Sequence, residues 1–84
     1  MVTVKLFGTL RLESGIRELS CDAETVKALY PALMREIRAC RADTALTERD
    51  LRGCLVAVNG VPAGPRTRLR DGDTVSFFPA AAGG

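Results

Sequence analysis

The stretch Leu55-Val56-Ala57-Val58-Asn59-Gly60 decides the fold class of this sequence. Four consecutive apolar residues are typical of a strand that is buried on both faces, and Asn-Gly strongly favours the tight turn of a hairpin. We therefore predict a central strand over residues 55–58 that ends in a turn at 59–60. Such a strand needs neighbouring strands and a covering layer, and the flanking segments offer both.

The N-terminal segment has the pattern of a strand hairpin. Val2, Val4 and Leu6 recur at every second position, which is the period of a half-buried strand. Two glycines bracket a short connection over residues 8–15, and residues 16–20 can form a second strand. We predict that the two strands pair as a hairpin, and their register stays open.

A change of period indicates one main helix after Asp22. Its apolar stripe, at positions i, i+3, i+4, i+7 and i+11, consists of Val26, Leu29, Tyr30, Leu33 and Ile37. Thr25 or Asp22 can cap the first turn. Pro31 lies inside the stripe, and we expect a kink or a restart there because proline lacks the amide for the helical bond. Residues 39–52 are predicted as a loop in which residues 47–50 could close one helical turn.

The last strand is predicted over residues 74–78. Residues 61–70 contain two prolines, a glycine and three arginines, which is typical of a turn-rich crossover, and Asp-Gly-Asp at 71–73 forms a further turn. Pro79 ends the strand because proline has no amide to donate to the sheet.

These elements predict an α+β domain with a mixed sheet packed against one main helix. With 84 residues, 46% hydrophobic and 26% charged, the chain has the length and composition of a single globular domain. We assign the domain to residues 1–79 and a flexible C-terminal tail to residues 80–84, which have no side chain large enough to anchor them.

Composition excludes several classes of function. Twelve basic and ten acidic residues leave a net charge of +2, without the concentrated basic face of a dedicated nucleic-acid binder. No apolar stretch has the length of a signal sequence or a membrane span, so we expect a cytoplasmic protein without a membrane partner.

The cysteines and the lack of histidine limit the chemistry. Cys21, Cys40 and Cys54 are too widely spaced for a disulfide framework or a metal site, so we expect three reduced thiols, with Cys54 packed as a small apolar residue. Without histidine the commonest general base and the usual imidazole ligand are missing. Most catalytic groups must therefore come from a partner.

Several groups of residues together resemble a known family. They are Ala57-Val58-Asn59-Gly60, Leu69-Arg70-Asp71-Gly72-Asp73-Thr74-Val75, Phe77-Phe78-Pro79 and Gly83-Gly84. This combination is similar to the MoaD/ThiS family of ubiquitin-like sulfur-carrier proteins, and the Phe-Phe-Pro triplet most resembles the small subunit of molybdopterin synthase, MoaD. The resemblance implies a ubiquitin-like β-grasp fold.

The resemblance also implies a two-stage function. An adenylyltransferase of the ubiquitin-activating type (MoeB-like) uses ATP to adenylate the Gly84 carboxylate, and a sulfur donor converts it to a thiocarboxylate. The large subunit of molybdopterin synthase (MoaE-like) then uses this sulfur in molybdenum cofactor biosynthesis and supplies the catalytic groups. No cofactor or metal is expected to be bound to the carrier itself.

Candidate partner-binding residues lie in the tail and around the last strand: Gly83, Ala82, Ala81, Pro79, Phe78, Arg11 and Pro62. Glycine at the last two positions lets the backbone pass through a narrow channel. Alternation in the last strand assigns Val75 and Phe77 to the core and Phe78 to the opposite face, where an exposed aromatic suits the centre of an interface. Arg11 is included because of the resemblance.

Each of these side chains also has a simpler interpretation. Phe78 could pack under the loop formed by residues 62–65, and Arg11 could be an ordinary surface charge. Arg66, Arg68 and Arg70 alternate toward one side, where they could steer an acidic partner or form a solvated edge.

The function itself has alternatives. The sulfur could be destined for thiazole, cysteine or another sulfur-containing product. The Gly84 carboxyl could instead be joined to lysines, as in a ubiquitin-like protein modifier. A plain β-grasp binding domain with an accidental Gly-Gly ending is a third possibility.

Overall fold

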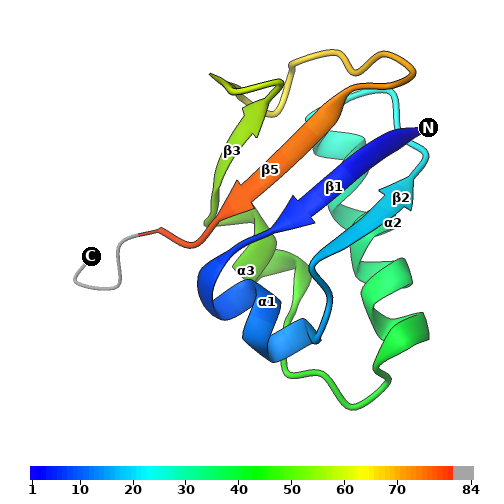
Figure 1. The fold of residues 1–84 in the computed structure, drawn as a ribbon, viewed down its shortest axis with the longest axis vertical. Helices are drawn as coiled ribbons and strands as arrows, with labels where there is room; N and C mark the ends of the chain where they lie inside the picture. Colours follow the sequence, from blue (N-terminus) through cyan, green and yellow to red (C-terminus); the bar gives the residue numbers. More distant parts are fainter. Residues whose placement is uncertain (81–84) are drawn as a thin grey trace.

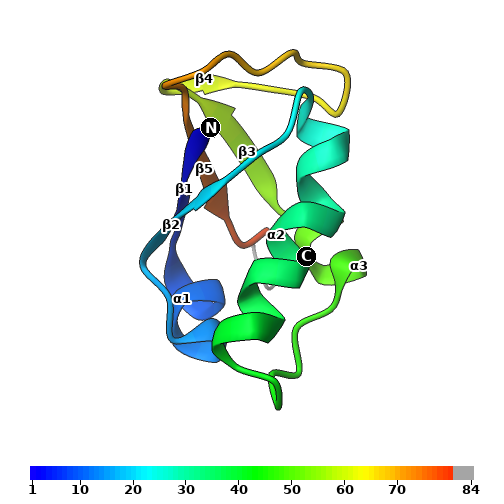
Figure 2. The same cartoon turned by 90° about the vertical axis from the view of Figure 1, so that its right-hand side faces the viewer.

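The first and last strands of the chain lie side by side in a five-stranded sheet, and the longest helix covers one face of that sheet (Figures 1 and 2). The computed structural model describes residues 1–80. In chain order the elements are β1 (Val2–Leu6), α1 (Gly8–Ser14), β2 (Glu18–Cys21), α2 (Val26–Cys40), α3 (Glu48–Arg52), β3 (Leu55–Val58), β4 (Val61–Pro62) and β5 (Thr74–Phe78). The predicted α+β fold, with a mixed sheet and one main helix, is confirmed.

The strands are arranged across the sheet in the order β2-β1-β5-β3-β4. β1 and β5 are parallel, whereas the other neighbouring pairs are antiparallel. The predicted N-terminal hairpin is present as β1 and β2, although β2 begins at Glu18 and not at residue 16. In the parallel pair Leu6 lies opposite Phe77, so β1 and β5 end at the same edge of the sheet.

The prediction that residues 55–58 are buried on both faces is wrong. Val56 is 8% exposed, whereas its neighbour Leu55 is 65% exposed. Because α2 covers only one face of the sheet, alternate residues of β3 face the solvent. The predicted turn after β3 is confirmed, with φ of +51° at Asn59 and +84° at Gly60. Both angles are positive, as the type I′ turn favoured by Asn-Gly requires.

Residues 8–14 form a short helix, α1, which the predicted connection between the first two strands did not include. Leu10 and Ser14, one turn apart, are its two buried residues. The helix ends at Gly15, whose φ of +72° is left-handed and whose N–H donates to the carbonyl of Arg11 at 2.9 Å. Seven residues with one buried apolar side chain give no helical period that could be distinguished from a loop.

The predicted main helix is confirmed as α2, and its stripe is buried throughout: Val26, Leu29, Tyr30, Leu33 and Ile37. Thr25 is the cap, since its hydroxyl oxygen accepts the N–H of Ala28 at 3.1 Å. The helix continues through Pro31 without a restart. Pro31 is exposed, so the carbonyl of Lys27, which loses its helical partner, can be hydrated.

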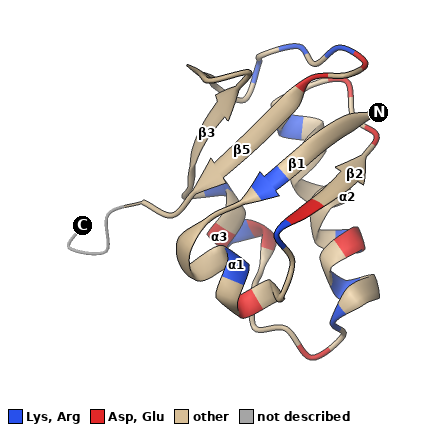
Figure 3. Cartoon of the chain, viewed as in Figure 1, with Lys and Arg blue, Asp and Glu red and all other residues tan. Residues whose placement is uncertain are grey.

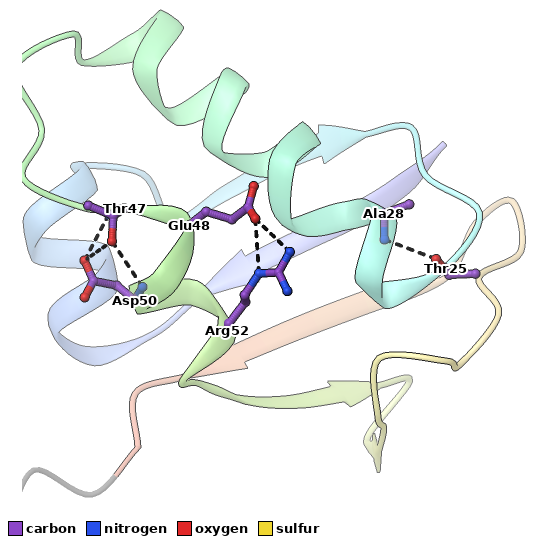
Figure 4. A network of polar contacts seen from close by, with 6 residues as sticks. All are labelled: Thr25, Ala28, Thr47, Glu48, Asp50 and Arg52. Carbon is purple, nitrogen blue, oxygen red and sulfur yellow. Dashed lines mark hydrogen bonds and ion pairs between the residues drawn. The ribbon is translucent and has the colours of Figure 1, made fainter.

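The predicted loop over residues 39–52 is too long, because α2 extends to Cys40 and α3 occupies the end of the segment. The helical turn anticipated near residue 47 is present as α3. Its capping box is complete: the Thr47 side chain accepts the N–H of Asp50 at 3.3 Å, and the Asp50 carboxylate accepts the N–H of Thr47 at 2.9 Å. Figure 4 shows both bonds.

Phe77 is the centre of the core between the sheet and α2. Its side chain has no exposed surface, and its ring meets Tyr30 edge-on at a centroid distance of 6.1 Å. Val75 is equally buried, which confirms the predicted orientation of β5. The guanidinium of Arg52 lies 5.4 Å from the Tyr30 ring and joins α3 to the same cluster.

The chain leaves β5 in close contact with the start of α1. The N–H of Phe7 donates to the carbonyl of Phe77 at 3.2 Å. Gly8 follows with a φ of +58°, and a Cβ at this position would lie only 2.8 Å from Cγ of Pro79. This close approach requires glycine at position 8. The contact with Gly8 positions Pro79, at which the C-terminal segment leaves the sheet.

Phe77→Ala is expected to lower the free energy of unfolding by about 3–5 kcal/mol, because it leaves a cavity in a fully buried site. Phe78→Ala, one residue later on the open face, should cost less. Denaturant unfolding followed by circular dichroism measures both. A larger loss for Phe78→Ala would show that β5 faces the opposite way.

Gly8→Ala should destabilise the fold more than Gly60→Ala, by about 1–3 kcal/mol, because only the first substitution also crowds Pro79. Gly60 is a matched control: its φ is +84° and a Cβ there would meet nothing within 4 Å. Both variants share the cost of a positive φ, so the difference in their unfolding free energies isolates the contact. Equal losses would mean that Pro79 does not pack on Gly8.

Candidate functional site

An aromatic pair lies where β1 and β5 end. The rings of Phe7 and Phe78 stack with their centroids 4.7 Å apart and an angle of 13° between their planes. Phe78 is nevertheless 39% exposed, because alternation in β5 turns it away from the core. The predicted exposure of Phe78 is therefore correct, and its neighbour Phe7 is an addition that the sequence pattern did not indicate.

Apolar side chains extend from this pair across β3 and β4 on the same face of the sheet. Leu55 pairs directly with Phe78, and Ala57 pairs with Pro62. A shallow hollow of about 370 Å³ is lined by Cys54, Leu55, Val56, Ala57, Pro62, Ala63 and Phe78. We call Phe7, Leu55, Ala57, Pro62 and Phe78 the open-face patch. Apolar side chains that gather on an uncovered face of a sheet commonly mark an interaction site, so the patch is a candidate docking surface.

The loop after β4 borders Phe78 but does not cover it. Pro62 and Ala63 line the same hollow as the Phe78 ring, which remains partly exposed. The alternative in which Phe78 is buried under residues 62–65 is therefore not what the structure shows. Of the candidate residues, the structure brings Pro62 and Phe78 together on one surface.

A basic groove borders the patch on the side of β1. It has a volume of about 410 Å³ and is lined by Lys5, Leu6, Phe7, Arg11, Arg17 and Glu18. Figure 3 shows the positive residues of β1, α1 and the segment before β2 near one another. Within residues 1–80 no ion pair includes the three cations of the groove, Lys5, Arg11 and Arg17. Arg11, included because of the family resemblance, thus lies beside Phe7 at the rim of the open-face patch.

A third hollow surrounds the start of the C-terminal segment. This cleft of about 430 Å³ lies between α1 and α3, and Pro79 and Ala80 form part of its wall. Asp50, which lines the cleft, also completes the capping box of α3 with Thr47 (Figure 4). The candidate residues Ala81, Ala82, Gly83 and Gly84 lie outside the described residues.

Two of the three cysteines, Cys21 and Cys54, are packed side chains, whereas Cys40 is exposed at the end of α2. Cys21 is buried, and burial raises the pKa of its thiol to about 11. Cys54 is half-buried, its thiol donates to the carbonyl of Asp50 at 3.2 Å, and burial raises its pKa as well. Both thiols are therefore protonated at neutral pH. Across residues 1–80 no cluster of His, Cys, Asp or Glu could hold a metal ion.

Comparison with known structures gives several matches along nearly the whole chain. The small archaeal modifier protein 1 of Methanosarcina acetivorans is 26% identical with a TM-score of 0.74, and the match covers 99% of this chain and 95% of that one. A chain of the Amycolatopsis orientalis BexX/CysO complex is 28% identical with a TM-score of 0.71, and both chains are covered completely.

A third structure is the complex of subunits 1 and 2 of the molybdopterin-converting factor from Helicobacter pylori. The matching chain is 26% identical with a TM-score of 0.61, and the match covers 99% of this chain and 97% of that one. A comparison with curated proteins found no match.

Two further observations bear on the class of protein. Among the helices formed by residues 1–80, none has the length and apolar character needed to cross a membrane. The family model named ThiS matches residues 4–84, which include all of the sheet except the first two residues of β1, the open-face patch and the terminal Gly-Gly. With the β-grasp architecture and these structural neighbours, the match shows that the chain belongs to the ThiS family of ubiquitin-like sulfur carriers.

Proposed function

We propose that this chain carries sulfur as a thiocarboxylate on Gly84 and delivers it as the small subunit of molybdopterin synthase. The observation that carries the proposal is the open-face patch at the edge of the sheet from which the C-terminal segment departs. The family match to residue 84 and the similarity to a subunit complex of the molybdopterin-converting factor support it.

The chemistry at Gly84 needs an activating partner. An α-carboxylate is ionised at neutral pH and is a poor electrophile. In the proposed first step its oxygen attacks the α-phosphorus of ATP in a MoeB-like enzyme, and pyrophosphate leaves. Sulfide-level sulfur from a donor (HS⁻ or its equivalent) then attacks the acyl carbon, so that the C–S bond forms as the C–O bond to AMP breaks. The chain supplies the acyl group, and the partners supply the catalytic groups.

The globular body serves as the handle for this reaction. Five residues follow Pro79 in the sequence, a segment that spans at most about 17 Å when extended. That length suffices to enter a partner's active site. Docking the body beside such a site makes the encounter with substrate effectively intramolecular, which can contribute several kcal/mol to catalysis.

The open-face patch and the basic groove together describe the partner surface. Phe78 and Leu55 offer an apolar centre, while Arg11, Lys5 and Arg17 form a positive rim next to Phe7. Interfaces commonly have an aromatic centre surrounded by polar residues. A MoaE-like or MoeB-like partner should therefore present an apolar surface bordered by carboxylates.

Gly84→Ala is expected to abolish the sulfur-for-oxygen mass change in the chain purified from cells that contain its activating enzyme, because the added methyl blocks a narrow channel. Gly64→Ala is the matched control, since a Cβ there would meet nothing within 4 Å. Intact mass spectrometry reads the modification. Unfolding free energies should stay within about 0.5 kcal/mol for both variants, because the buried core lies within residues 2–77. A thiocarboxylate on Gly84→Ala at the native level would contradict the proposal.

Phe78→Ala should weaken binding to the large synthase subunit by about tenfold or more, as is usual for an aromatic at the centre of an interface. Leu12→Ala is the control, because Leu12 is 78% exposed on α1 and lies outside the patch. Isothermal titration calorimetry measures both affinities. If the two variants bind as tightly as the native chain, the open-face patch is not the docking surface.

Protein modification is the second candidate, because the small archaeal modifier protein shares the fold over nearly the whole length of this chain. Both functions begin with the same adenylate. Conjugate ladders that carry an N-terminal tag and disappear in Gly84→Ala would favour modification. If the chain restores growth to cells that require thiazole and does not bind the large synthase subunit, its sulfur is destined for thiazole.

A further inference from the structure

The loop between β4 and β5 carries three arginines in an alternating arrangement. Arg66, Arg68 and Arg70 are exposed, whereas Thr67 and Leu69 between them are partly buried. Leu69 packs against the hydrophobic core, so the backbone has a fixed inner side. We propose that the three arginines form a docking surface for an acidic protein segment in an extended conformation. This proposal does not depend on what Gly84 carries.

Hydrogen bonds to the start of α2 hold the loop in place. The carbonyls of Pro65 and Thr67 accept the N–H groups of Lys27 and Val26 at 2.9 and 3.0 Å. The N–H of Leu69 donates to the carbonyl of Glu24 at 2.8 Å. These bonds also satisfy free amides at the N-terminus of the helix. The arginines therefore project from an ordered backbone, which reduces the entropy lost on binding.

The carboxylates that follow the loop have other partners. Asp71 accepts the Met1 ammonium at 2.6 Å. Asp73 accepts the backbone N–H of Arg70 at 2.7 Å and the side-chain amide of Asn59 at 3.0 Å, and these bonds lower the pKa of its carboxyl. In the part of the chain that the structure describes, no ion pair includes Arg66, Arg68 or Arg70. Their guanidinium groups are free to bind another protein.

The arginine-bearing part of the loop, residues 66–70, lies apart from the aromatic pair of the open-face patch. The loop leads into the start of β5, whereas Phe78 and Pro79 lie at the other end of that strand (Figure 1). A protein bound to the three arginines would leave Phe7, Phe78 and the beginning of the C-terminal segment accessible. The chain could therefore bind an acidic protein at one end while a second partner holds the other end.

The spacing of the arginines fits an extended acidic segment. Alternate residues of an extended chain lie about 6.5–7 Å apart, and guanidinium groups bind carboxylates bidentately. Asp or Glu at every second position of a partner would match all three. A nucleic acid fits less well, because within residues 61–74 no aromatic side chain is present for base stacking.

The test is a titration of the full-length chain with a blocked peptide in which glutamate alternates with serine, followed by amide chemical shifts at low salt. The expected shifts are concentrated in residues 65–70. Arg66→Gln/Arg68→Gln/Arg70→Gln should weaken binding by about tenfold, the sum of three modest exposed contacts. The control Arg35→Gln/Arg38→Gln/Arg41→Gln removes the same charge from α2 and the residue after it and should change the affinity less than twofold.

Several outcomes would overturn the proposal. Equal weakening by the two triple variants would show that net charge alone attracts the peptide. Shifts centred on Lys5, Arg11 and Arg17 would assign the acidic segment to the basic groove. Equal binding of a glutamine-serine peptide would exclude charge recognition. A short single-stranded oligonucleotide that binds residues 65–70 more tightly than the acidic peptide would make the loop a nucleic-acid surface.

Discussion

The parallel pairing of β1 with β5 is the constraint on which the candidate site depends. Parallel strands run in the same direction, so the two strands end at one edge of the sheet, and the register places Leu6 opposite Phe77. The next residues after Leu6 and Phe77 are Phe7 and Phe78, and their rings stack on each other. One residue further, Gly8 makes room for Pro79. The aromatic pair and the start of the tail thus follow from one register.

Successive side chains of β5 point to opposite faces of the sheet, so one aromatic residue serves folding and the next is available for binding. Phe77 fills the core against Tyr30 and gives the sheet its stability, and Phe78 must then face outward. The open face can display an aromatic because α2 covers only the opposite side of the sheet. A small domain cannot bury all of its apolar surface, and here the exposed remainder lies where the chain leaves β5 at Pro79.

The features that sequence predicted well have a strong period. The stripe of α2 and the two-residue alternation of β1 and β5 each mark a buried face over several residues, so Val75, Phe77 and the exposed Phe78 could be assigned without a structure. A turn at Asn59 could be recognised because its dipeptide is specific.

The features that sequence missed depend on tertiary contacts. α1 has a single buried apolar residue, Leu10, so its helical period is too weak to detect. The four apolar residues of β3 indicate a strand, but only the placement of α2 decides which of its faces is covered. Phe7 stacks on Phe78 only because β1 pairs with β5, and the sequence pattern does not specify that pairing. The tail residues Ala81 to Gly84 were assigned from the family resemblance, and their roles stay predictions.

The molecule therefore presents two ends with different properties. One end has the open-face patch, the basic groove and the start of the C-terminal segment, which suit a partner that acts on the terminus. The other end has the ordered arginine loop. The central claim is that the terminus of this chain is an acyl group for adenylation. ATP–pyrophosphate exchange by the cognate adenylyltransferase tests it most directly: exchange should depend on the native chain, and exchange that is absent with the folded native chain would contradict the account.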